Sequence, residues 1–525
     1  MNGMYAFCIW DKKKNRLFCA RDRLGIKPFF YTMREGVFYC ASEIKGLLRA
    51  GIEANANNEI IFDYLAYGAY EHSEDTFFAG IRQLPPGHTL VVEPGRFEMR
   101  KYWDIDPASE SLQDVRDFSL PDFRKSVDRF TQLLLESITL RLRSDVPIAV
   151  HVSGGLDSTL MMAALNRING GPGLLKAFSY YYDEKKYDEK PYVSQASRKV
   201  GWSPHFCPLR SSEVPSFFEE AMWFQEQPFP GILTLAKHSL IKKSHAFGTK
   251  VVLEGQGGDE IGAGYQYNFG AFILDALKAG AATLAQKELR GFARQHGMNA
   301  DEASEAFLNS MASCFGLGRS ADGTPFVKNE CLAGDFLHHC SHELQFPAPF
   351  RSHLLNMQYR DIRYTKLPRI LRSCDRASMA YGRELRVPFL DYRLVEFSFA
   401  LPGNHKVKDG VQRYFEREAL KGFLDSRLAG LPKRAVVDPQ REWLKGPLAE
   451  WVRGILTSRT FRERGIFDQK KVVEEYERYT AARSNPNSFH LWQWISLELW
   501  FRTFIDGGGA VKKDTVVRDE GKVPA

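Results

Sequence analysis

One stretch of the sequence has the residue types and spacing for phosphate chemistry, SGGLDS at residues 153–158. It follows an apolar run, Val146 to Val152 (VPIAVHV), and precedes a stretch of helical spacing. Two adjacent glycines at such a turn let backbone amides approach a phosphate, and the helix adds unpaired N–H groups and the positive end of its dipole. No lysine lies in the turn, so it is not a Walker A loop. The glycines alone would fit a tight turn capped by Ser158 equally well, but the whole string is more specific and predicts an anion cradle.

A second glycine-rich cluster, EGQGGDE at residues 254–260, follows another apolar run, Lys250 to Leu253 (KVVL). In an open α/β sheet, ligands bind at the carboxyl ends of the strands, so the two clusters are expected to share one site. Asp157 and Asp259 would then face each other and hold Mg²⁺, which takes oxygen ligands and few carboxylates. The plain alternative for Asp157 is an acid at a helix N-terminus, stabilised by the dipole by about 0.3 to 1 kcal/mol.

Strands and helices alternate through the part of the chain that carries both clusters. The pattern predicts a helix over 159–169, a strand over 176–181, a helix over 188–200 and a strand over 205–209. This alternation is typical of βαβ units and a mostly parallel sheet covered on both faces. Residues 1 to 104 instead show short apolar runs separated by turn residues, which predicts a β-rich unit. Residues from about 266 to 505 are dominantly helical by periodicity.

Composition and charge narrow the class of protein. The 525 residues are 44% hydrophobic and 26% charged, close to the averages of globular proteins. The net charge of +7 is too weak to indicate a nucleic-acid partner. No stretch approaches the roughly 18 apolar residues of a membrane helix, and the start, MNGMYAFCIWDKKK, is unlike a signal peptide. We therefore expect a cytoplasmic enzyme without a membrane partner, whose eight dispersed cysteines are reduced.

Six strings of the sequence carry a family resemblance. SGGLDS after a buried strand resembles the pyrophosphate-binding loop of the PP-loop ATP pyrophosphatases, which split ATP into AMP and pyrophosphate. Together with EGQGGDE, the strings DRASMA (375–380) and RELRVPFLD (383–391) resemble the asparagine synthetase family. ARDRLGIKPFFY (20–31) and ASEIKGLL (41–48) resemble the second half of that family's N-terminal glutaminase domain. The likeness runs to about residue 505.

The resemblance implies an α/β fold in several parts. Residues 126–505 would form a parallel-sheet, Rossmann-like ATP pyrophosphatase (PP-loop) domain with a helical extension. Residues 105–125 would be a linker, and residues 1–104 a partial, β-rich N-terminal-nucleophile domain, that is, a partial class II glutamine amidotransferase domain. Residues 506–525, glycine-rich and then charged, would be a disordered tail.

The resemblance also implies ATP-dependent amide formation. The side-chain carboxylate of aspartate would attack the α-phosphorus of ATP, pyrophosphate would leave, and ammonia would displace AMP from the acyl-adenylate. ATP and Mg²⁺ are the expected cofactors, Asp157 and Asp259 the expected metal ligands. The residues carried over as ATP-binding are Val152, Ser153, Gly154, Gly155, Leu156, Asp157, Ser158, Tyr180, Glu254 and Gly255.

Lys433 and Gln256 are the catalytic residues that the resemblance implies. Lys433 stands where the family has a lysine ahead of a GF…P…W motif, but Ala435 and Val436 replace GF, so Arg434 competes for this role and a solvated lysine is the plain alternative. Gln256 stands where some members have a glutamate. An amide does not titrate near neutral pH, so we expect an orienting role rather than a general base.

Two glutamates beside Gln256 have an ordinary alternative. Glu254 and Glu260 would be capping or solvated carboxylates if they do not contact the nucleotide.

The N-terminus departs from the family pattern. Glutamine hydrolysis there uses an N-terminal cysteine, whereas this sequence begins Met1-Asn2 and its first cysteine, Cys8, lies in an apolar strand pattern that predicts a buried structural thiol. No glutaminase nucleophile is assigned, and we expect use of free ammonia, directly or from a separate glutaminase, unless the cell makes a longer chain. An incomplete β-layer would expose strand edges and apolar surface. Relatives that form homodimers through this domain make a homodimer a further expectation.

Three other functions remain open at this stage. The same fold amidates other carboxylates, such as a uronic acid of a surface polysaccharide, or closes a lactam or peptide ring. The tRNA-modifying ATP pyrophosphatases share SGG-x-DS, but they call for a basic RNA-binding face. A non-catalytic protein on a decayed glutaminase scaffold is disfavoured by the retention of Asp157, Asp259 and Lys433.

Overall fold

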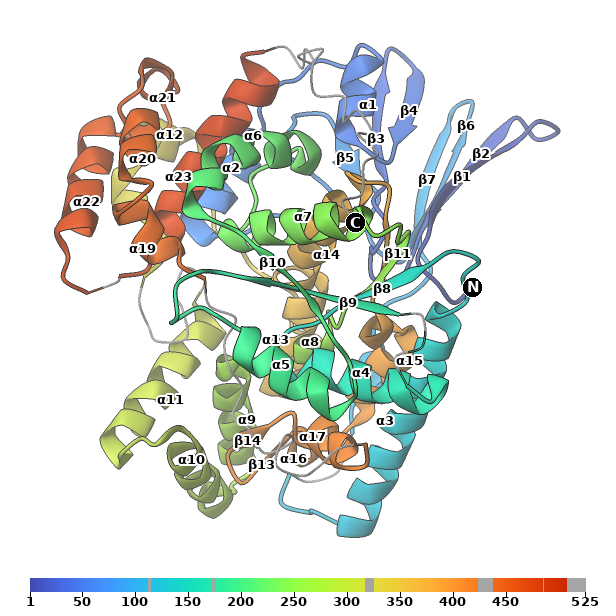
Figure 1. Cartoon of the computed structure of the whole chain (residues 1–525). Helices are drawn as coiled ribbons and strands as arrows, with labels where there is room; N and C mark the ends of the chain where they lie inside the picture. The colour runs from blue at the N-terminus through green and yellow to red at the C-terminus, as the bar shows by residue number, and fades with distance from the viewer. Residues whose placement is uncertain are drawn as a thin grey trace.

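A five-stranded parallel sheet forms the centre of the computed structural model, which describes residues 1–111, 115–171, 173, 175–316, 325–423, 438–484 and 486–507 (Figure 1). The strand order is β10-β9-β8-β11-β12. The strands are β8 (Ile148–His151), β9 (Lys176–Tyr181), β10 (His205–Pro208), β11 (Val251–Leu253) and β12 (Glu384–Arg386). The chain runs outward from β8 to β10 and then returns to place β11 on the other side of β8. The switch point of the sheet therefore lies between β8 and β11, where a crevice for ligands is expected.

Helices cover both faces of this sheet, as predicted (Figure 1). They are α3 (Leu120–Arg141), α4 (Leu156–Asn169) and α5 (Lys190–Lys199) on one face, and α7 (Ile232–His245) and α14 (Leu367–Met379) on the other. The helix predicted over 159–169 begins three residues earlier, because Gly155 and not Ser158 is its N-cap. Helix α3 begins at Leu120 after the capping residue Ser119, so the last residues of the predicted linker are helical.

The N-terminal residues form two antiparallel sheets, which confirms the predicted β-rich unit. One has the order β1-β2-β6-β7 and the other β4-β3-β5. Their elements are β1 (Ala6–Asp11), β2 (Arg16–Arg21), β3 (Phe30–Arg34), β4 (Val37–Ala41), α1 (Ile44–Arg49), α2 (Asn58–Tyr67), β5 (Arg82–Gln83), β6 (His88–Glu93) and β7 (Arg96–Lys101).

The prediction that Cys8 is a buried thiol is wrong, because Cys8 is exposed. It lies on β1, one of the two edge strands of the described sheet, opposite Cys19, which is fully buried. The same sheet exposes Ile9, Trp10 and Phe97 at 55%, 51% and 46% of their surface, in line with the expected open β-layer. The seven described cysteines are free, in line with the expected reduced thiols.

The remainder of the chain is helical, in line with its periodicity. After α6 (Val214–Gln225) come α8 (Gly258–Gly262), α9 (Gln266–Lys278), α10 (Ala282–His296), α11 (Ala300–Phe315), α12 (Gly334–Cys340), α13 (His353–Arg363), α15 (Tyr392–Ala400), α16 (Gly403–Lys406), α17 (Tyr414–Lys421), α19 (Gln440–Lys445), α20 (Ala449–Leu456), α21 (Arg459–Glu463), α22 (Gln469–Ala481) and α23 (Phe489–Trp500), with the short strands β13 (Val407–Lys408) and β14 (Val411–Gln412). The predicted tail, 506–525, lies outside the described residues from 508 onward.

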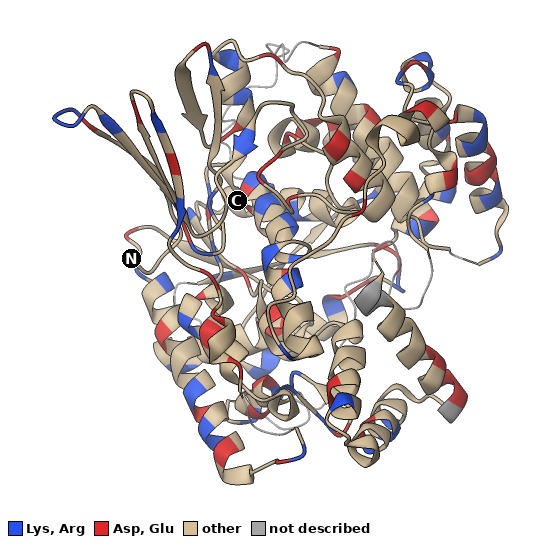
Figure 2. Ribbon diagram, turned by 180° about the vertical axis from the view of Figure 1, so that it is seen from behind, with Lys and Arg blue, Asp and Glu red and all other residues tan. Residues whose placement is uncertain are grey.

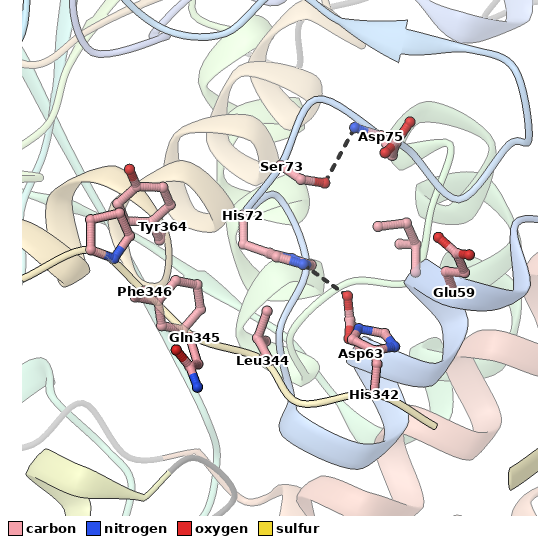
Figure 3. Close-up of a pocket in the computed structure, with 12 residues that line it drawn as sticks. Glu59, Asp63, His72, Ser73, Asp75, His342, Leu344, Gln345, Phe346 and Tyr364 are labelled. Carbon is pink, nitrogen blue, oxygen red and sulfur yellow. Dashed lines mark hydrogen bonds and ion pairs between the residues drawn. The ribbon is translucent and has the colours of Figure 1, made fainter. Parts of the chain in front are cut away.

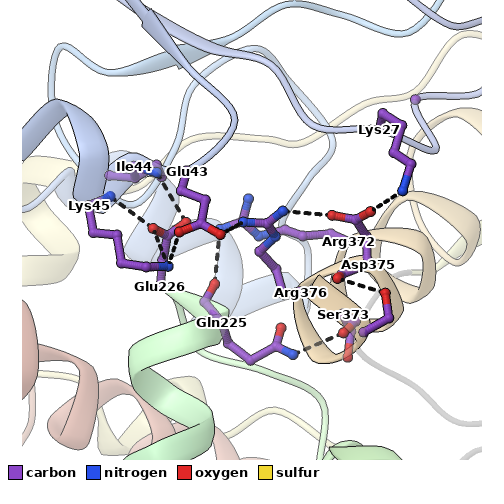
Figure 4. A network of polar contacts seen from close by, with 12 residues as sticks. Lys27, Glu43, Ile44, Lys45, Gln225, Glu226, Arg372, Ser373, Asp375 and Arg376 are labelled. Carbon is purple, nitrogen blue, oxygen red and sulfur yellow. Dashed lines mark hydrogen bonds and ion pairs between the residues drawn. The ribbon is translucent and has the colours of Figure 1, made fainter. Parts of the chain in front are cut away.

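A buried polar network joins the N-terminal unit to the sheet domain (Figure 4). Asp375 on α14 accepts from Lys27 Nζ at 2.9 Å and from Arg376 Nη2 at 2.7 Å. Arg376 in turn reaches Glu43 at 3.0 Å. These contacts place the DRASMA motif at the boundary between the two units.

Glu226 makes the second link at this boundary. Its side chain is fully buried and accepts from the backbone N–H groups of Ile44 and Lys45 at 3.1 and 2.8 Å. A carboxylate from the sheet domain thus caps α1 of the N-terminal unit, where the helix dipole favours negative charge.

Charges of both signs are interspersed over the helices on the side of the molecule drawn in Figure 2. In the described part of the chain, no helix is both long and apolar enough to cross a membrane.

Candidate active site at the sheet switch point

Two serines close the loop that follows β8. Ser158 Oγ donates to the carbonyl of Ser153 at 2.6 Å, and the backbone N–H of Ser153 donates to Ser158 Oγ at 3.1 Å. The N–H of Gly155 donates to Ser153 Oγ at 3.3 Å. Val152, before the loop, is buried and bonds to the carbonyl of Phe178 on β9 at 2.9 Å. The loop is therefore held as a compact turn at the N-terminus of α4, whose first residues are Leu156 and Asp157.

Glycines let the surrounding chain approach this loop closely. A Cβ atom on Gly255 would lie 2.9 Å from Asp157 Cβ and 3.3 Å from the backbone nitrogen of Ser158. A Cβ on Gly154 would lie 2.8 Å from Tyr192 Cβ. The two glycine-rich clusters thus touch each other, as their positions after neighbouring strands predict.

Asp157 and Asp259 also meet, with an arginine between them. Arg413, the N-cap of α17, pairs through Nη2 with Asp157 Oδ1 and through Nη1 with Asp259 Oδ1 at 3.0 Å. Its Nε donates to Glu416 Oε2 at 2.6 Å. Burial raises the pKa of Glu416 to about 8 against the opposing charge of Arg413. The predicted pair of carboxylates is therefore assembled around one positive charge.

The donor set around Arg413 fits a divalent cation. Asp157 and Asp259 both direct carboxylate oxygens toward the positively charged guanidinium of Arg413. Carboxylates are ligands that Mg²⁺ prefers. Glycines make the room, because a Cβ on Gly258 or Gly264 would lie 2.2 Å from the carboxylate oxygen of Asp157 or Asp259, respectively. Among the described residues, no three His, Cys, Asp or Glu side chains form a ready metal cluster.

Glu254 belongs to a buried ionic cluster at the ends of β8 and β11. Its Oε1 accepts from His151 Nδ1 at 2.6 Å, and its Oε2 lies 3.6 Å from Lys237 Nζ. Burial alone would raise the pKa of Glu254, but the charge of Lys237 and the hydrogen bond from His151 outweigh it and hold that pKa below its ordinary value. Lys237 also lies 3.0 Å from Cys374 Sγ.

Gln256 is oriented by this cluster. Its Nε2 donates to Glu254 Oε2 at 3.3 Å, so the amide group is tied through its nitrogen. The amide position thus depends on a carboxylate that Lys237 and His151 themselves hold in place.

The alternative that Glu254 and Glu260 are solvated is wrong, since their exposed fractions are 4% and 2%. Glu260 accepts from Tyr265 Oη at 2.6 Å. Burial and the neighbouring charge of Asp259 raise the pKa of Glu260 to about 7.

The remaining predicted residues lie at different distances from this centre. Tyr180, half-buried near the end of β9, packs edge-on against Tyr182 with 5.9 Å between ring centroids. Leu390 of the RVPFLD motif fills the space beside Gly257, whose Cβ would lie 2.2 Å from Leu390 Cδ2. Lys433, with its neighbours Arg434 to Val436, lies outside the described residues.

Four residues of the site were not predicted from the sequence: His151, Lys237, Arg413 and Glu416. A histidine inside the apolar run VPIAVHV, directly before SGGLDS, was the one available signal. Arg413 and Glu416 read as an ordinary i,i+3 pair on a helix surface.

A separate pocket of about 330 Å³ lies between α2 and residues 342–347 (Figure 3). Asp63 on α2 pairs with His72 at 2.9 Å and with His342 at 2.8 Å. None of its lining residues belongs to the sequence motifs, so the site at the switch point is the candidate active site.

The chain is similar to known proteins over most of its length. A family model described as asparagine synthase matches residues 129–502, and one described as a glutamine amidotransferase domain matches residues 1–103. The chain is 28% identical over 522 residues to the amidase chyE of Penicillium rubens, covering 91% of this chain and 76% of the relative. It is 27% identical over 519 residues to the amidase chry2 of Gibberella zeae, with 89% and 74% covered. Identity to glutamine-hydrolyzing asparagine synthetase 3 of Bacillus subtilis is 27% over 496 residues, with 91% and 74% covered.

Proposed function

The chain belongs to the asparagine synthase family, and from that premise we propose that it converts aspartate, ATP and ammonia to asparagine, AMP and pyrophosphate through an acyl-adenylate. It is a ligase that forms carbon–nitrogen bonds in an ATP-dependent amidation. Aspartate as the acceptor is the part that we propose.

The convergence of Asp157 and Asp259 on one positive charge at the sheet switch point supports this proposal most directly. Both carboxylates follow strands that lie side by side, β8 and β11. Such a crevice is where open α/β sheets bind nucleotides.

Each group of this site has a role in the proposal. The loop 153–158 and the N-terminus of α4 bind the phosphates through backbone N–H groups and serine hydroxyls. Val152 and Tyr180 flank the adenine, and Gly255 lies along the nucleotide with Glu254 behind it. Asp157 and Asp259 would hold Mg²⁺, which supplies positive charge that offsets the charge growing on the leaving pyrophosphate.

Two catalytic roles complete the proposal. Lys433 contributes a cation toward the phosphates, and Gln256 orients the acyl-adenylate and the incoming amine. In this proposal residues 1–104 form a partial amidotransferase unit without an assigned nucleophile, and residues 126–505 form the synthetase unit. A cytoplasmic location, a homodimer and the absence of a nucleic-acid partner remain predictions.

Product analysis tests the proposed function. Incubation with aspartate, ATP, Mg²⁺ and ammonium is expected to yield asparagine, AMP and pyrophosphate in equal amounts, measured by chromatography and mass spectrometry. A parallel reaction with glutamine in place of ammonium identifies the nitrogen source of this polypeptide. ADP as the product, or no nucleotide cleavage with any carboxylate, would contradict the proposal.

The relatives named amidases favour a second candidate, in which the acceptor is another carboxylic acid. The nucleotide site is then unchanged and only the acceptor pocket differs. AMP formation that requires a carboxylate other than aspartate, without asparagine, would favour this candidate.

Replacing Gln256 with alanine is expected to lower carboxylate-dependent ATP–pyrophosphate exchange about tenfold, because one hydrogen bond to a charged group is worth about 1.5 kcal/mol. The matched control is Gln469→Ala, which removes a glutamine bonded to the carbonyl of Leu456 on the far helices. Exchange at the wild-type rate in Gln256→Ala would remove Gln256 from the proposed site.

A further inference from the structure

Arg413 occupies the point where the two proposed metal ligands meet. Its exposed fraction is 3%, and its guanidinium contacts Asp157 through Nη2 and Asp259 through Nη1. These two residues lie in α4 and α8, the helices that follow the neighbouring strands β8 and β11, and Arg413 is the N-cap of α17, far along the chain. One side chain therefore bridges both sides of the crevice.

The surroundings are shaped for this bridge. A Cβ on Gly258 would lie 2.7 Å from Arg413 Nη2, and a Cβ on Gly264 would lie 2.8 Å from Arg413 Cδ. Neither Gly258 nor Gly264 therefore has room for even a methyl group beside the arginine. Arg413 itself has a φ of +59°, in the left-handed region that residues other than glycine rarely adopt.

Glu416 gives the guanidinium a third acidic partner. It lies fully buried one helical turn after Arg413 and accepts from Arg413 Nε at 2.6 Å. This contact uses Nε and Nη2, whereas Nη1 is directed to Asp259. Glu416 can therefore keep hold of Arg413 when the two aspartates take another cation.

A divalent metal and this guanidinium would compete for the same two carboxylates. Arg413 contacts Asp157 Oδ1 and Asp259 Oδ1, and a metal held by these two side chains would lie close to the guanidinium, where like charges repel each other strongly. A metal ion that binds without a nucleotide must break the buried, charge-assisted contacts of Arg413 with the two aspartates, and it brings no anion to replace them. A metal that arrives with a triphosphate brings an anion for the released guanidinium.

We propose that Arg413 is a positioning residue that stands in for the divalent cation in the nucleotide-free protein and so couples metal binding to nucleotide binding. This inference rests on the proposed metal site of Asp157 and Asp259. The metal displaces Arg413 from the aspartates, and the triphosphate of the nucleotide binds the displaced guanidinium. By linkage, metal and nucleotide therefore each favour the binding of the other. The metal alone then binds poorly.

Mn²⁺ binding in the absence of nucleotide tests this inference. The bound fraction is measured from the electron paramagnetic resonance signal of the free ion. Arg413→Met is expected to bind Mn²⁺ about tenfold or more tightly than wild type, since tenfold corresponds to only about 1.4 kcal/mol and close charge pairs are worth at least that. Arg413→Lys keeps a cation and should bind Mn²⁺ as weakly as wild type. The matched control is Arg464→Met, which removes another arginine bonded to a buried carboxylate, Glu498, on the distant α21 side.

A second variant guards against misfolding. If Arg413→Met does not fold, the double variant Arg413→Met/Glu416→Leu replaces the buried pair with apolar side chains, a change that proteins often tolerate. It is expected to show the same gain in Mn²⁺ affinity.

The outcomes separate this inference from the proposed function. Wild type that binds Mg²⁺–ATP while Arg413→Met or the double variant gains no Mn²⁺ affinity would overturn the inference alone. Wild type that does not bind Mg²⁺–ATP, measured by isothermal titration, would overturn the proposed function and the inference with it.

Discussion

Asp157→Asn is expected to reduce ATP–pyrophosphate exchange by about 10³-fold, equivalent to roughly 4 kcal/mol of transition-state stabilisation. Asparagine keeps the shape of the side chain but removes its charge, so Asp259 would be left as the single carboxylate facing the cation. The loss is large because metal-assisted charge stabilisation is worth several kcal/mol. Exchange of labelled pyrophosphate into ATP, measured over a series of Mg²⁺ concentrations, checks this.

The control for this change is Asp183→Asn. Asp183 follows β9, is about half exposed and pairs with Arg210 at 3.2 Å, so it shares the sheet edge but not the crevice. Its loss should leave exchange within a factor of about two, because exposed ion pairs contribute little. Asp157→Asn that keeps more than a tenth of the wild-type rate, with the same Mg²⁺ dependence, would remove Asp157 from the metal site.

Glu254→Gln is expected to lower the free energy of unfolding by about 3 to 5 kcal/mol at pH 7, the usual result of removing one partner from a buried charge pair. Lys237 would keep its charge in a buried place, and His151 would lose its carboxylate partner. Urea denaturation followed by tryptophan fluorescence measures the change. Gln256 would then face a neutral amide, a weaker acceptor than the carboxylate, so exchange activity should fall together with stability.

The pH dependence of this variant has a definite sign. The pKa of Glu254 is lower in the folded protein than in the unfolded chain. Its stabilising contribution is therefore present above the unfolded value, about 4.3, and is lost as the pH falls toward the folded value. Wild type should lose stability on acidification below about pH 5, whereas Glu254→Gln should lose less over the same range. Equal acid sensitivity of the two proteins would contradict the assigned role of Glu254.

Much of the sheet could be predicted because its signals are local. The apolar runs at 146–152, 176–181 and 250–253 form β8, β9 and β11 nearly as predicted. Their order along the chain places both glycine clusters at one edge, which is enough to bring Asp157 and Asp259 together. The family strings add what the strands alone do not give, the nucleotide and the reaction.

Arg413 and Lys237 could not be predicted because their partners are remote in sequence. Arg413 meets Asp157 across 256 residues, and Lys237 meets Cys374 across 137. In the sequence each is one of 71 basic residues, and most of these lie in solvent. The prediction that Cys8 is buried was wrong for a related reason, because an apolar strand pattern does not reveal whether another layer covers the strand.

The boundary network around α14 affects what a shared motif can be taken to mean. Asp375 and Arg376 of DRASMA form ion pairs with Lys27 and Glu43 of the other unit. Each unit therefore supplies charged partners to the other, and either unit expressed alone would expose these unpaired charges to water. The charged residues of DRASMA therefore serve the contact between the two units.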